Sequence, residues 1–158
     1  MKSWFIGGIF NPSRRRVDAV KVQRSSDVPL QEVQMEGAAK CQVRWLVSKT
    51  DGAPNFAMRQ FELQPGGHTP RHHHPYEHEI YILEGEGEAW EGDRAHPMKA
   101  GDVLLVTPDE VHQFRNTGST VLKMLCLIPN SADNRPVGQR PECSQVAPAP
   151  SSASVPLQ

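Results

Sequence analysis

The chain has 158 residues, a length typical of a single domain that can bury a sizeable core. Its 17 Lys and Arg and 18 Asp and Glu are mixed along the chain and give a formal net charge of -1. This balance indicates neither nucleic acid nor a membrane as partner, and no apolar run approaches the roughly 20 residues of a membrane-spanning helix.

Residues 1–35 carry few periodic signals, and we expect them to form a partly ordered N-terminal arm. The opening stretch, residues 1–10, is faintly apolar but too short and too weakly charged for a signal peptide. Cys41, Cys126 and Cys143 have no paired spacing, which favours reduced thiols over a disulfide scaffold. A cytoplasmic protein is therefore the expectation.

Residues 36–130 form the predicted core domain, in which short β-rich runs alternate with turn residues and no helix is expected. The expected strands are Gln42–Ser48, Phe56–Leu63, Glu79–Leu83, Gly87–Trp90, Val103–Val106, His112–Asn116 and Val121–Ile128. Many short strands with turn signals every 8–12 residues or so predict an all-β antiparallel sandwich or barrel.

Residues 131–158 are dominated by Pro, Ser, Ala, Asn and Gln. Such a composition buries too little apolar surface to offset the entropy of ordering the chain, so we expect a disordered tail.

Histidines gather in one short stretch, since five of the seven lie between His68 and His78. His72 and His74 are two residues apart, so both imidazoles leave the same face of an extended backbone. A bend at residues 75–77 brings His78 to the start of the next strand, and His112 can join from a paired strand. Because neutral imidazole is the commonest protein ligand for transition metals, these four histidines predict a metal site.

The same residues resemble the cupin superfamily at both of its motifs. Gly66, His72, His74, His78 and Gly85 fit the first motif. Gly101, Pro108, His112 and Asn116 fit the second, although the proline falls one place late and Glu110 replaces the usual second glycine. The resemblance implies an antiparallel double-stranded β-helix, the jelly-roll barrel of the cupins.

The third ligand of the first motif departs from most cupins, which have glutamate there. Counting back from Gly85 places His78 in this position, with Glu79 as the alternative. Neighbouring residues on a strand face opposite ways, so only one of the two can point inward. Four imidazoles would leave the charge of a divalent ion uncompensated and favour anionic or enolate-like ligands.

Further segments, such as 53–59 and 125–129, are similar to the small single-domain, four-histidine manganese cupins. That resemblance implies manganese first and iron second, two coordination positions left open for water or substrate, and oxidative cleavage of carbon–carbon double bonds. Ni, Cu or Zn could occupy the same ligands, because Mn and Fe bind weakly in the usual divalent series. Small cupins are commonly dimers, so a homodimer is expected.

The last strand is expected to supply one wall of the substrate pocket. The side chains of this strand alternate between its two faces. Only one face carries a full charge, that of Lys123, so the other face, with Met124, Cys126 and Ile128, is expected to point inward. The four-histidine relatives likewise place the residue matching Cys126 near the metal. The predicted lining residues are Phe114, Met124, Cys126, Ile128 and Arg59. For Met124 and Cys126 the alternative is ordinary core packing. Arg59 could reach a substrate carboxylate or lie on a solvated, salt-bridged face.

Three functions are compatible with these residues. The first is a Mn- or Fe-dependent, dioxygenase-like oxidoreductase that cleaves a carbon–carbon bond of a small apolar, aromatic or enolic substrate. The second is a non-redox lyase or isomerase that acts on a sugar-acid-like substrate. The third is a ligand-binding cupin without catalysis.

Overall fold

The computed structural model describes residues 20–132 and 144–145 of the chain. In this part, the only helical segments are the 3-10 turns η1 (Ser25–Asp27) and η2 (Lys49–Asp51), and no helix is long and apolar enough to cross a membrane. The strands are β1 (Gln31–Glu32), β2 (Ala39–Val47), β3 (Phe56–His68), β4 (His72–His73), β5 (His78–Glu84), β6 (Glu86–Glu91), β7 (Arg94–Lys99), β8 (Val103–Val106), β9 (His112–Arg115), β10 (Leu122–Pro129) and β11 (Ser144–Gln145).

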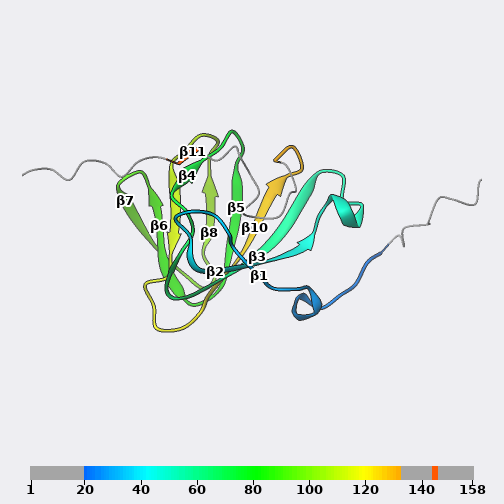
Figure 1. Ribbon diagram of the computed structural model, residues 1–158, viewed down its shortest axis with the longest axis horizontal. Helices are drawn as coiled ribbons and strands as arrows, with labels where there is room; N and C mark the ends of the chain where they lie inside the picture. The colour runs from blue at the N-terminus through cyan, green and yellow to red at the C-terminus, as the bar shows by residue number, and fades with distance from the viewer. Residues whose placement is uncertain (1–19, 133–143, 146–158) are drawn as a thin grey trace, which may run out of the picture.

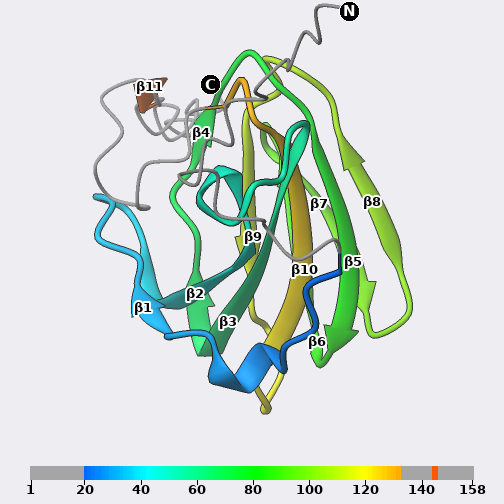
Figure 2. The same ribbon diagram turned by 90° about the vertical axis from the view of Figure 1, so that its right-hand side faces the viewer.

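The strands form one antiparallel sheet that curls into a barrel with two facing walls (Figures 1 and 2). One wall has the order β2-β3-β10-β5-β8, and the other contains β4, β9, β6 and β7. The long strand β3 links the walls, because its last residue, His68, pairs with Arg115 of β9. This architecture confirms the predicted all-β jelly-roll barrel.

The alternation along β10 decides which of its side chains fill the barrel. Leu122, Met124, Cys126 and Ile128 are buried, whereas the residues between them are half-buried on the outer face. Lys123, the charged residue of the outer set, forms an ion pair with Glu84 of the neighbouring strand. The period-2 prediction therefore placed the interior face correctly.

Two segments that lie outside the expected strands are strand in the structure. Strand β3 runs through residues 65–67, where Gly66 has φ +74° and a Cβ on Gly67 would lie 2.6 Å from the Lys40 carbonyl oxygen. The pairing of β2 with β3 shifts register beside these glycines, so they form a bulge within the strand. The segment around His96 is strand β7, in which Pro97 is tolerated because, among the described strands, β7 pairs only with β6.

Both terminal segments lie partly outside the described residues. Of the predicted arm, residues 1–19 fall outside them, while residues 31 and 32 form β1 against β2. Of the predicted disordered tail, residues 133–143 and 146–158 fall outside them. The two residues between these gaps form strand β11, which pairs with β4.

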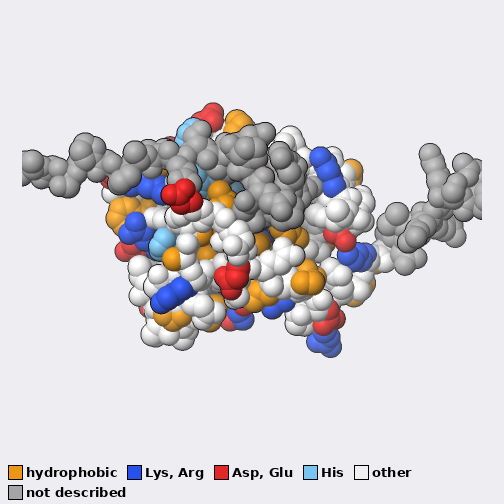
Figure 3. All heavy atoms as spheres, viewed as in Figure 1, with side chains coloured by type: hydrophobic (Ala, Val, Ile, Leu, Met, Phe, Trp, Pro, Cys, Tyr) orange, Lys and Arg blue, Asp and Glu red, His pale blue; other side chains and the backbone are white. Residues whose placement is uncertain are grey.

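Acidic and basic side chains are interspersed on the face of the molecule seen in Figure 3. This mixture agrees with the near-zero net charge of the chain. No large field of a single sign is visible on that face.

Candidate metal centre

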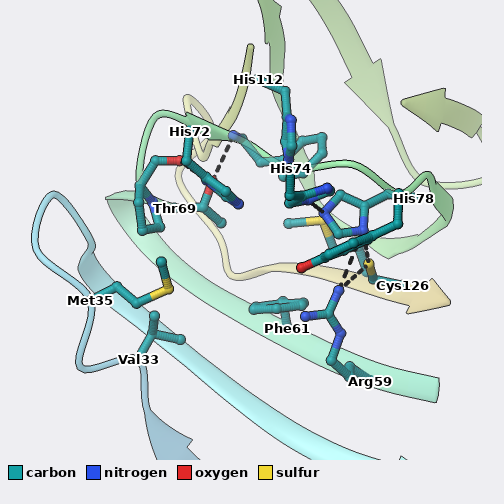
Figure 4. Close-up of a pocket in the computed structure, with 14 residues that line it drawn as sticks. Val33, Met35, Arg59, Phe61, Thr69, His72, His74, His78, His112 and Cys126 are labelled. Atoms are coloured by element: carbon teal, nitrogen blue, oxygen red, sulfur yellow. Dashed lines mark hydrogen bonds between the residues drawn. The ribbon is translucent and has the colours of Figure 1, made fainter. Parts of the chain in front are cut away.

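Four histidine side chains meet inside the barrel, between its two walls (Figure 4). His72 lies on β4 and pairs with His112, the first residue of β9. His74 follows β4 directly, and His78 begins β5 after the bend at residues 75–77. One ring nitrogen from each of the four lies within 4.8 Å of the others. The local geometry is the one that the spacing predicts: two histidines from one extended segment, one across a bend and one from a paired strand.

Backbone carbonyls fix the orientation of two of these rings. His72 Nδ1 lies 3.0 Å from the Pro70 carbonyl oxygen, and His112 Nδ1 lies 2.8 Å from that of Glu110. A carbonyl oxygen only accepts, so each Nδ1 carries the proton and donates it. The lone pair of each ring is therefore on Nε2, as in metal-binding histidines whose other nitrogen donates to a carbonyl.

The remaining ring nitrogens are also placed where a shared cation could accept their lone pairs. His112 Nε2 is buried and has no hydrogen-bond partner among the described residues. His74 Nε2 and His78 Nε2 lie 2.8 Å apart, so two nitrogen atoms that both can act as acceptors face each other. The four residues could hold a transition metal, which would accept these lone pairs.

Burial keeps three of these histidines neutral, the form that binds a metal. Burial lowers the pKa of His74 to about 3, with further lowering by the nearby His112 and His72 rings. The pKa of His78 is well below its usual value, chiefly because of burial and then because of the Arg59 charge. Burial also lowers the pKa of His112. No proton therefore competes for these three rings at neutral pH.

The structure distinguishes His78 from its neighbour Glu79. His78 is 5% exposed and points inward, whereas Glu79 is exposed on the outer face of β5. The other three histidines lie outside the cluster. His73 is half-buried on β4 and is not among the four clustered residues, and His68 Nδ1 lies 3.2 Å from the Thr69 carbonyl oxygen. His96 pairs with Glu91 across the β6–β7 hairpin, at 2.9 Å.

Similarity to known proteins agrees with this geometry. Residues 59–128 match the model of the cupin domain family, and this range contains all four histidines. The chain is 32% identical over 107 residues to protein SchB of Streptomyces halstedii, covering 66% of this chain and 78% of that protein. The chain belongs to the cupin superfamily.

Two further relatives of this cupin have informative names. An oxalate-binding protein of Thermotoga maritima is 34% identical over 111 residues, which cover 68% of this chain and 92% of that protein. The structure of the polyketide cyclase RemF from Streptomyces resistomycificus superposes with a TM-score of 0.71 at 29% identity. It covers 83% of this chain and 88% of RemF.

A small cavity adjoins the four imidazoles of the cupin. Four of the five predicted lining residues, Arg59, Phe114, Met124 and Cys126, border it. Ile128 does not border it, because it lies two residues further along β10 and packs in the core with 1% exposure. The alternation of side chains along a strand predicts which face a residue lies on, but not how far along the barrel axis it lies.

The cavity also has lining residues that the sequence did not indicate. Tyr76 stacks on His74 with ring centroids 3.7 Å apart and an interplanar angle of 7°. Val33 and Met35, which follow β1 in the predicted arm, close another side together with Phe61. Figure 4 shows Val33 and Met35 across the cavity from the histidines. Their part in the cavity depends on tertiary packing, for which the sequence carried no local signal.

Arg59 and Cys126 lie directly behind His78. Arg59 Nη2 donates to Cys126 Sγ at 2.9 Å, and the same sulfur lies 3.5 Å from His78 Nδ1. Burial raises the pKa of the Cys126 thiol, although the Arg59 charge acts to lower it. Arg59 is thus inside the barrel and not on a salt-bridged outer face, one of the two alternatives that the sequence left open.

Proposed function

We propose that this cupin is a metal-dependent oxidoreductase of the dioxygenase type, with manganese or iron held by His72, His74, His78 and His112. The observation that carries the proposal is the convergence of four imidazoles, three of them buried and that of His72 half-buried, within 4.8 Å and beside an otherwise mainly apolar cavity. Such an ion, when bound, would supply open coordination positions and one-electron chemistry toward O2.

The chain's own residues would hold the ion and keep water away from it. The neutral imidazoles provide the ligands, and Pro70 and Glu110 orient two of them through their carbonyl groups. Phe61, Phe114 and Met124 give the cavity an apolar wall, which suits a small apolar or enolic substrate and excludes bulk water.

The cavity offers few acid–base groups for proton transfer, which favours redox chemistry. Among the described residues that line it, none is Asp or Glu and the only histidines are the four proposed ligands, so Tyr76 and Cys126 are the remaining groups that could transfer a proton. A lyase or isomerase would require a positioned general acid or base.

The similarity to RemF, a polyketide cyclase, supports a second candidate in which the ion acts only as a Lewis acid. A polyketide substrate is larger than the present cavity, whose volume is about 50 Å³. This second function therefore requires the Val33 and Met35 side of the cavity to open.

Oxygen consumption tests the proposal. Mn- or Fe-loaded protein should take up O2 with at least one member of a panel of diketones, catechols, styrenes and flavonols, as measured with an oxygen electrode; the larger members of the panel likewise require the Val33 and Met35 side of the cavity to open. Zn-loaded protein serves as the control and should take up none. Turnover without O2 uptake, equally fast with Zn, would instead support the Lewis-acid candidate.

We also propose that the cupin is a homodimer. Val103 and Leu105 of β8 are 75% and 67% exposed, and Val103 pairs with Tyr81, another exposed apolar residue. Exposed apolar side chains on adjacent strands suit burial against a second copy. Light scattering should give twice the chain mass for the native protein and a lower mass for Leu105→Lys. A native mass of one chain would contradict the dimer.

A further inference from the structure

Arg59 reaches the cavity from β3 and ends beside the metal-binding histidines (Figure 4). The residue is 6% exposed, and its Nη2 lies 3.5 Å from His78 Nδ1. A guanidinium group stays protonated under all ordinary conditions, so this position holds a permanent positive charge.

Two aromatic rings hold this charge in place. The Cζ atom of Arg59 lies 5.0 Å from the centroid of Phe61 and 5.5 Å from that of Trp45. Contacts of this kind attract a cation to the ring face and restrict its side chain. The guanidinium group is therefore ordered before any ligand arrives, which lowers the entropy cost of binding one.

The rings supply no formal negative charge, and neither does the rest of the described cavity. Among the described residues, no ion pair involves Arg59 and no Asp or Glu lines the cavity. In addition, Arg59 Nε is buried without a hydrogen-bond partner there. Burying a cation without an anionic partner costs several kcal/mol in typical cases. A buried cation that is retained at this cost is therefore expected to serve a function, such as binding an anionic ligand.

A divalent ion at the proposed centre would increase this imbalance. The ion would bring two positive charges and Arg59 one, and the four ligands are neutral imidazoles. An anionic ligand would compensate both cations at once. A guanidinium group is also the side chain best suited to bind a carboxylate, because its N–H groups match the two oxygens.

We propose that Arg59 forms an anion subsite of the metal centre and that the small substrate of this cupin carries a carboxylate group. One end of the ligand faces the ion and its oxyanion faces the Arg59 guanidinium group. The cavity volume of about 50 Å³ has room for roughly four water molecules, which limits the ligand to a few non-hydrogen atoms in this conformation. This inference rests on the metal site of the proposed function but not on its redox chemistry.

Acetate and its neutral isostere acetamide are suitable probes, because they have the same size and differ in charge. Protein loaded with Co²⁺, a spectroscopic substitute, would be titrated with each, and binding followed by visible absorption. The variants are Arg59→Met, Arg59→Lys, and Arg94→Met as a control with the same change in net charge at an exposed residue of the β6–β7 hairpin.

Native protein and Arg94→Met should bind acetate equally well and acetamide much more weakly. We expect Arg59→Met to keep one Co²⁺ per chain but to bind acetate at least about 30-fold more weakly, as for loss of one partner of a buried charge pair. Arg59→Lys keeps the charge without the two-pronged geometry and should be intermediate. It also provides the test if Arg59→Met does not fold.

Equal acetate affinity in native protein and the Arg59 variants, with Co²⁺ bound in all, would overturn the anion subsite and leave the metal centre intact. Equal affinity of native protein for acetate and acetamide would also overturn the anion subsite. Failure of native protein to bind any metal would instead contradict the proposed function and, with it, this subsite.

Discussion

Replacing His78 with alanine should abolish stoichiometric metal binding, whereas Glu79→Ala should leave it unchanged. His78 is buried with its Nε2 directed at His74 Nε2, while Glu79 is exposed on the other face of β5. Loss of a ligand should weaken binding by more than the 10–100-fold that is typical of losing an outer hydrogen-bond partner. Elemental analysis gives the metal content, and EPR of Mn-loaded protein reports on nitrogen coordination.

The two variants control for each other, since they alter neighbouring residues of one strand. His78→Gln adds a further control, because it retains a polar side chain of similar size in the buried position. If the folded His78→Ala protein held manganese as tightly as native protein while Glu79→Ala lost it, glutamate would be the third ligand, as in most cupins. Circular dichroism establishes that each variant is folded.

The sequence was sufficient to predict these histidines because their geometry is local. The two-residue spacing of His72 and His74 selects one strand face, and a short bend separates them from His78. Only His112 comes from a distant segment, and the second motif identified it. Properties that depend on period and spacing can therefore be derived from the chain alone.

Only part of the remaining cavity could be predicted, because several of its lining residues depend on distant contacts. Tyr76 was visible in the sequence only as part of a bend, yet its ring stacks on His74. Met35 lies in the predicted arm and reaches the cavity because β1 pairs with β2. Ile128 faces the interior as predicted but lies too far along β10 to border the cavity. These outcomes depend on how strands are stacked along the barrel, which a single strand's pattern does not encode.

The structure explains why this motif position, residue 85, requires glycine. The sequence identified this glycine by its distance from His78. In the barrel it lies between β5 and β6 with φ +79°, and an added Cβ would lie 2.5 Å from the Val121 carbonyl oxygen. The start of β10 therefore passes too close to Gly85 for any side chain.

Gly85→Ala should be strongly destabilising, and Gly92→Ala is its matched control. Gly92 also has positive φ, at +52°, but a Cβ there would have nothing within 4 Å. An alanine in the left-handed region costs about 1–2 kcal/mol at either site, partly offset by the lower entropy of the unfolded chain. At Gly85 the clash with backbone should add about 1–3 kcal/mol.

Thermal unfolding followed by circular dichroism measures the difference between these two variants. We expect Tm to fall by roughly 10 °C for Gly85→Ala and by only a few degrees for Gly92→Ala. His78 begins β5 and Gly85 directly follows it. Gly85→Ala should therefore also weaken metal binding, while Gly92→Ala should not. Equal losses of stability would mean that positive φ alone, and not the approach of β10, requires glycine at position 85.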